Sequence, residues 1–155
     1  DQVGRSKAGL LHHFGSRDRL LLEIVQRRDE VNRQEFVPDA EGTFDASVAL
    51  VAHNATVPGL VALFAVVAAL AASDTLDTDR REYFTRRYAR IRAGFARRIA
   101  HGQAEGVLRA DLDPTVAANI VLATMDGLQI QWLLDPSIDM AKHLRALVAL
   151  LAADR

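Results

Sequence analysis

The spacing of apolar and polar positions predicts helices along the whole chain. Apolar residues recur every three or four positions, and valine, isoleucine and aromatic residues do not alternate over strand lengths. The clearest pattern covers residues 79–105, where one face is apolar and arginines fill the other. The apolar face consists of Phe84, Tyr88, Ile91, Phe95 and Ile99. We therefore expect an all-α fold in which these arginines form a solvated face.

Helix-capping residues predict several helix ends. Pro58 suits the first turn of an apolar helix, and Gly106 suits the left-handed residue that closes the long helix. Asp113 before Pro114 is typical of an N-cap followed by the first helical residue. The last helix is expected to begin near Asp139.

Two further helices are expected in the first third of the chain. One covers about residues 16–35, and the other begins at a cap on Thr43, after a loop over 36–42. A stripe on the first contains Leu20, Ile24, Arg27 and Val31, and the inward positions of the second are Phe44, Val48 and Val51.

Residues 57–72 form a run without any polar side chain. A membrane span needs about 20 apolar residues. This run is shorter and is bounded by Pro58 and Asp74. We therefore expect a helix buried inside a helical protein and no membrane partner, with a membrane span as the alternative.

The helix that follows Asp113 is apolar on two sides. One stripe contains Val121, Met125, Leu128 and Trp132, and the other contains Ile120, Ala123, Gly127, Ile130 and Leu134. Two apolar stripes need two partners, of which one is the chain's own core. The simplest second partner is another copy of the last two helices, which would make a four-helix bundle. The expected homodimer interface consists of Ile120, Ala123, Gly127, Ile130, Leu144 and Leu147.

Composition and motifs limit the kinds of chemical site that the chain can contain. The chain has 155 residues, a formal net charge of −1 and no cysteine, so disulfides and thiolate metal sites are excluded. The histidines are too scattered for a metal site, and no catalytic triad, phosphate-binding loop or supported carboxylate pair is present. We expect a cytoplasmic protein that is not an enzyme and has no cofactor or metal.

Residues 3–22, VGRSKAGLLHHFGSRDRLLL, carry the strongest functional signal. A short helix can begin at an N-cap on Ser6, and a longer helix can begin at Ser16. A compact basic helix with small residues can approach base edges in a major groove. This segment resembles the recognition helix and following helix of TetR-family transcriptional regulators. Arg5 and Leu11 depart from the family pattern, which has an apolar residue and usually a phosphate-binding tyrosine there.

The resemblance implies a regulator that binds operator DNA. The implied DNA-binding residues are Ser6, Lys7, Gly9, His12, His13 and Arg17. A helix-turn-helix also needs an upstream helix, so we expect a chain that lacks the first part of that domain. The expected division is residues 1–34 for the end of the DNA-binding domain with its linker helix, and 35–155 for an effector-binding and dimerisation domain.

The C-terminal part is similar to the dimerising helices of the same family, in residues 106–114 and 126–136. The resemblance implies a ligand-responsive repressor with a cavity among its middle helices and a small hydrophobic effector. The candidate ligand-binding residues are His53, Phe64, Tyr88, Phe95, Met125, Gln129 and Trp132. The alternative for each is an ordinary core residue, and for His53 a capping or surface residue. The alternative function is an all-α small-molecule-binding or structural dimer without a DNA role.

Overall fold

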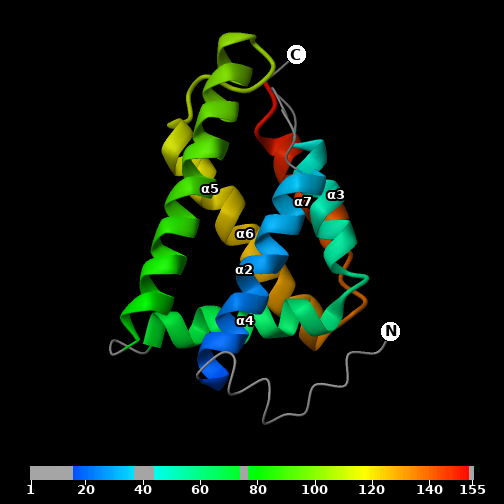
Figure 1. Cartoon of the computed structure of the whole chain (residues 1–155). Helices are drawn as coiled ribbons and strands as arrows, with labels where there is room; N and C mark the ends of the chain where they lie inside the picture. Colours follow the sequence, from blue (N-terminus) through cyan, green and yellow to red (C-terminus); the bar gives the residue numbers. More distant parts are fainter. Residues whose placement is uncertain (1–15, 37–43, 74–76, 154–155) are drawn as a thin grey trace.

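The computed structural model describes residues 16–36, 44–73 and 77–153, and within these ranges it contains six helices. They are α2 (Arg17–Phe36), α3 (Asp45–Asn54), α4 (Pro58–Ser73), α5 (Thr78–Ala104), α6 (Pro114–Leu134) and α7 (Met140–Leu150). The all-α prediction is confirmed. In Figure 1, α4 runs crosswise at the end of the molecule where α2 and α5 begin, and α3 and α7 lie together on the other side of α2.

The predicted caps explain most of the helix ends. Asp113 accepts hydrogen bonds from the backbone N–H groups of Thr115 and Val116, both at 2.9 Å. Asp139 accepts one from Lys142 at 2.8 Å. Gly106 has a φ of 71°, the left-handed conformation that glycine adopts without steric cost.

Two helix starts differ in detail from the prediction. α3 begins after Phe44, which makes no side-chain cap, and Thr43 lies outside the described residues. α5 begins at Thr78, one residue earlier than expected, because Asp77 is its N-cap and accepts a hydrogen bond from the Arg80 N–H.

The buried apolar side chains form two clusters. The larger one, here called the C-terminal core, joins α3, α5, α6 and α7 with the first part of α4, and includes Val51, Phe95, Ile99, Val121, Trp132 and Leu144. The smaller one, here called the N-terminal core, joins α2, α4 and the first half of α5. Its members are Leu22, Val25, Phe64, Val67, Ala71 and Phe84. Tyr88 packs against both clusters, so it lies at their boundary.

Two predictions about polar positions are wrong. The buried residues of α2 are Leu22, Val25, Arg28 and Asn32, instead of the stripe that starts at Leu20. The arginines of α5 do not all lie in solvent, since Arg80 is 4% exposed and the side chain of Arg87 is 12% exposed. Both helices therefore place polar groups on the face that packs against the rest of the protein.

The apolar run over 57–72 forms most of α4, as predicted. Within the described ranges, no single helix is long and apolar enough to cross a membrane. Only α3 and α4 taken together, which meet at an angle of 102°, satisfy the length and composition of a span.

Candidate functional site

A cavity of about 270 Å³ lies between α2, α3, α5 and α6. The apolar part of its wall includes Phe36, Leu50, Ile91, Phe95, Leu122 and Met125. The polar part includes Arg28, Asp29, Asn32, Asn54, Arg87 and Asp126. An apolar cavity with a few polar groups is the usual form of a small-molecule site. Among the residues that the structure describes, no group of three or more histidine, aspartate or glutamate side chains could hold a metal ion.

An ion pair between α2 and α5 forms one side of the polar wall. The Nε of Arg87 donates to Oδ2 of Asp29 at 2.6 Å, and the Tyr83 hydroxyl donates to the same oxygen at 2.6 Å. Burial alone would lower the pKa of Arg87, but the carboxylate of Asp29 and its hydrogen bond outweigh burial, so that the pKa is raised. The pair is therefore a stable part of the wall.

Arg28 has a different environment, although it is adjacent in sequence to Asp29. It is 9% exposed, and its Nη2 donates to the neutral Oδ1 of Asn54 on α3 at 3.0 Å. Burial lowers the pKa of Arg28 despite the attraction of Asp29. The guanidinium also lies 5.1 Å from the centre of the Phe64 ring. Arg28 is thus a buried cation whose direct hydrogen bond goes to an uncharged group.

Asp126 comes from the opposite wall, on α6. Burial raises its pKa, while a hydrogen bond with Tyr88 and the charges of Arg87 and Arg28 oppose that rise. The net result is a raised pKa, so the Asp126 carboxyl group ionises less readily than it would in water.

Three buried atoms in the cavity residues have no hydrogen-bond partner among the described residues. They are Nε of Arg28, Nη1 of Arg87 and Oε1 of Gln129. Most buried polar atoms in native proteins are paired, because an unpaired one loses its hydration without compensation. Two unpaired donors and one unpaired acceptor therefore distinguish this cavity from an ordinary packing defect.

The structure brings together three of the seven candidate ligand residues. Phe95, Met125 and Gln129 line the cavity. His53 is not among the lining residues, but its ring lies 5.1 Å from the ring of Phe36, which lines the cavity. Tyr88 reaches the cavity only through its hydrogen bond with Asp126.

The expected convergence of aromatic side chains needs correction. Phe64 belongs to the N-terminal core, whereas Trp132 belongs to the C-terminal core, and neither lines the cavity. Helix spacing alone does not determine which part of a long interior each aromatic residue fills.

The sequence pattern missed the buried arginines although it contains a signal for them. Arg28 follows Val25 by three positions, and Arg87 lies three after Phe84 and four before Ile91. Both arginines therefore occupy the apolar stripes of their helices. An arginine at a position of the apolar stripe therefore predicts its own burial better than the number of arginines in the helix does.

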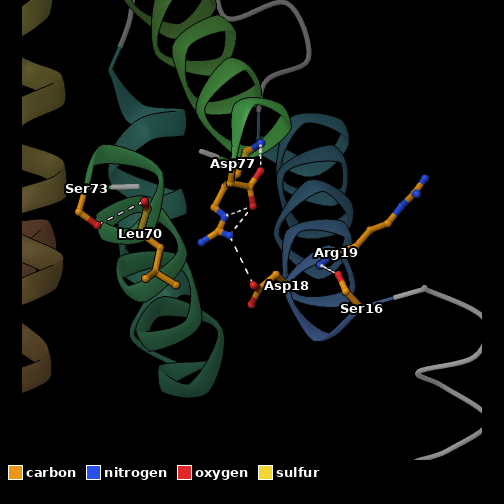
Figure 2. A network of polar contacts seen from close by, with 7 residues as sticks. Ser16, Asp18, Arg19, Leu70, Ser73 and Asp77 are labelled. Atoms are coloured by element: carbon orange, nitrogen blue, oxygen red, sulfur yellow. Dashed lines mark hydrogen bonds and ion pairs between the residues drawn. The ribbon is translucent and has the colours of Figure 1, made fainter. Parts of the chain in front are cut away.

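A second polar contact holds the first turn of α2. Asp18 lies 3.7 Å from the guanidinium of Arg80, which also pairs with Asp77. Figure 2 shows Asp18 at the start of α2 facing the start of α5, where Asp77 lies. Arg17, the first residue of α2, is exposed. The other candidate DNA-binding residues, Ser6, Lys7, Gly9, His12 and His13, lie outside the described residues.

The outer side of α6 is an exposed apolar stripe. Ile120 is 49% exposed, Ile130 53% and Leu134 83%, and Ala123 is also exposed. Gly127 lies on the same stripe, and a Cβ added there would meet nothing within 4 Å. Ile120, Ala123 and Ile130, which were expected at a dimer interface, are therefore exposed in the protomer, and the interface itself stays a prediction.

The α7 residues of the expected interface require a correction. Leu144 is 0% exposed because it packs inside the C-terminal core, so it cannot lie on an outer face. Leu147 is half-buried, whereas Leu150, which was not among the expected residues, is 71% exposed. The exposed side of α7 therefore contains Leu150 and not Leu144, so the helix presents a different face to solvent from the predicted one.

Comparison with known proteins agrees with this architecture. The family model described as BetI-type transcriptional repressor, C-terminal, matches residues 49–154. The chain belongs to the TetR family of transcriptional regulators. No curated protein sequence matches it.

Several solved structures share the fold of this TetR-family chain. A protein described as a transcriptional regulator from Saccharomonospora viridis, in complex with choline, has 27% identity and a TM-score of 0.74, covering 99% of this chain and 84% of that one. Salmonella enterica GusR has 27% identity and a TM-score of 0.68, covering 94% and 78%. A transcriptional regulator from Rhodococcus sp. Rha1 has 17% identity and a TM-score of 0.71, covering 98% and 83%, and this likeness concerns the fold alone.

Proposed function

We propose that this chain is the effector-binding and dimerising part of a ligand-responsive repressor that binds operator DNA as a homodimer. The observation that carries the proposal is the position of α2. This helix directly follows the predicted DNA-recognition segment, and it supplies Arg28, Asp29, Asn32, Arg33 and Phe36 to the cavity wall. A ligand in the cavity therefore contacts the helix that leads to the DNA-binding segment.

The mechanism is a shift between two positions of α2. A ligand that binds one position more tightly than the other raises the population of that position. In a dimer, the two recognition helices must match major grooves about 34 Å apart. A small rotation of α2 in each protomer would change their separation and lower the affinity for the operator. The contact between Asp18 and Arg80 would carry the movement of α2 to the start of α5.

The proposed dimer pairs the outer stripe of α6 with the same stripe of a second copy. The interface centres on Ile120, Ala123, Gly127 and Ile130, with Leu150 on the exposed side of α7. Removal of these side chains from water in both protomers would stabilise the dimer. A two-fold arrangement brings each stripe against itself.

The DNA-binding part of the proposal is tested with the full-length protein and a selected palindromic operator. We expect affinity to fall steeply with salt, and Lys7→Ala to weaken binding by removing a phosphate contact. Arg92→Ala, on α5 and outside the predicted recognition segment in the sequence, is the control. Unchanged affinity of the Lys7 variant would contradict the assignment of the recognition helix. Failure to bind any duplex would favour a binding or structural dimer without a DNA role.

The dimer is tested by substitution of glycines with equal space around them. Gly127→Leu adds a side chain that the protomer accommodates but that would separate two facing α6 helices. Gly59→Leu on α4 is the matched control, since its added Cβ also meets nothing within 4 Å. We expect monomers or aggregates only for Gly127→Leu, as measured by sedimentation. A monomeric parent protein at micromolar concentration would refute the dimer.

A further inference from the structure

The charge of the cavity wall constrains the ligand more than its volume does. Six arginines line the cavity, against the two aspartates Asp29 and Asp126. The Asp29 carboxylate already accepts hydrogen bonds from Arg87 and Tyr83, and the Asp126 carboxyl group is hydrogen-bonded to Tyr88. The acidic groups of the wall are therefore engaged, and Arg33 pairs with Glu30. Arg28 differs from Arg33 and Arg87, because its hydrogen bond goes to a neutral group.

The positive charge of Arg28 is incompletely compensated by its surroundings. It is 9% exposed, its hydrogen bond goes to the amide oxygen of Asn54, and its Nε has no partner among the described residues. Nη1 of Arg87 is likewise unpaired within the described part of the chain. A buried cation is costly unless a counter-charge and hydrogen-bond acceptors accompany it. A bound carboxylate supplies both, since its two oxygens can accept from two guanidinium groups.

Two of the aromatic rings at or near the cavity are poorly placed to hold a cation. Phe64 has the guanidinium groups of Arg28 and Arg87 at 5.1 and 4.6 Å from its ring centre. Phe95, in the wall itself, has Arg98 at 5.7 Å. Rings that already interact with arginines are not available for a quaternary ammonium group, which would also be repelled by them.

We propose that the effector is a small organic monoanion, a carboxylic acid with an apolar ring or chain, whose carboxylate lies between Arg28 and Arg87. This inference rests on the proposed effector cavity and adds the chemical class of its ligand. The apolar body of the acid packs against Leu50, Ile91, Phe95 and Met125. The unpaired Oε1 of Gln129 accepts a hydrogen bond from acids that also carry a hydroxyl group.

The test is calorimetric titration and thermal unfolding of the purified chain, without DNA, at constant ionic strength in chloride. The acids are benzoate, 4-hydroxybenzoate and cyclohexanecarboxylate. Benzyl alcohol and benzamide are neutral analogues of similar shape, and choline is the cationic probe. We expect the acids to raise the Tm by several degrees at saturation. The neutral analogues are expected to bind about tenfold more weakly or less, and choline not at all.

Variants locate the carboxylate. Arg28→Gln is expected to weaken binding of the acids about tenfold while leaving the neutral analogues unaffected. Arg28→Lys, which keeps the charge but loses the planar donor pair, should retain part of the affinity. Arg19→Gln is the control on the same helix, because Arg19 is exposed, lies 3.7 Å from Glu23 and is not among the residues that line the cavity. Folding of each variant is checked by its unliganded Tm.

The outcomes separate this inference from the proposed function. Binding of choline or of the neutral analogues in preference to every acid overturns the anionic ligand, as does absence of binding by all three acids. An equal loss for Arg28→Gln and Arg19→Gln would mean general attraction by positive charge, and would also overturn the proposal. Acids that bind here but leave operator affinity of the full-length protein unchanged refute the repressor mechanism alone.

Discussion

The two cores of this protein are built by different means. The C-terminal core is a continuous apolar cluster over five helices, with Val51, Val121 and Leu144 fully buried. The N-terminal core is smaller, and guanidinium groups of Arg28 and Arg87 lie over its Phe64 ring. Apolar packing is insensitive to the charge of a ligand, whereas an arginine cluster is not. If the proposed function holds, we expect the C-terminal core to act as scaffold and the N-terminal core to hold the part that responds to a ligand.

The position of α2 sharpens this contrast. The helix contributes Leu22 and Val25 to the buried apolar set, where they pack with α4, and polar contacts join it to α3 and α5. Because those polar contacts include buried charges, we expect the position of α2 to respond when they change.

The largest expected effect comes from the C-terminal core. Leu144→Ala should lower the free energy of unfolding by about 2–5 kcal/mol, because it leaves a cavity in a fully packed region. Leu22→Ala, the same truncation in the N-terminal core, should lie near the lower end of that range, since Leu22 is at the margin and 9% exposed. Urea unfolding at one protein concentration measures both. A larger loss for Leu22→Ala would reverse the assignment of scaffold and responsive region.

An intermediate effect is expected from the buried ion pair. Asp29→Asn removes the charge that faces Arg87 and should cost about 1.5–3 kcal/mol, as expected for hydrogen bonds to charged groups. The neighbouring Glu30, whose pair with Arg33 is exposed, provides the control. Glu30→Gln should leave stability unchanged within error, because solvent screens exposed pairs. Similar losses for both variants, compared by thermal unfolding in low and high salt, would show that burial of the pair does not matter.

The smallest effect concerns Asp126 and depends on pH. Its folded-state pKa lies above the usual value of 3.8, chiefly because of burial. In the wild-type protein, Asp126 therefore contributes stability to the folded state at pH below the usual pKa of 3.8. This contribution is lost as pH rises through the higher folded-state pKa. Asp126→Asn, which cannot ionise, should match the parent in acid and exceed its stability slightly near neutral pH. A variant that is less stable at neutral pH would mean that the Asp126 charge is required by Arg28 and Arg87.

The sequence by itself determined the helical elements and the two sides of α6. Asp113, Gly106 and Asp139 fix helix ends through local hydrogen bonds and backbone conformation, which need no distant partner. The division of α6 into a buried stripe with Val121 and an exposed stripe with Ile120 follows from the helical period alone.

Only the tertiary structure decided what α2 and α5 bury and where the cavity lies. Arg28 and Arg87 lie in the apolar register, but their burial requires Asp29, Asn54 and Phe64, which come together only when four helices pack. Leu144 likewise became a core residue because α7 turns toward α3. Local pattern fixes the faces of a helix, whereas the burial of a charge depends on partners far away in sequence, since a charge leaves water only where other groups replace its hydration.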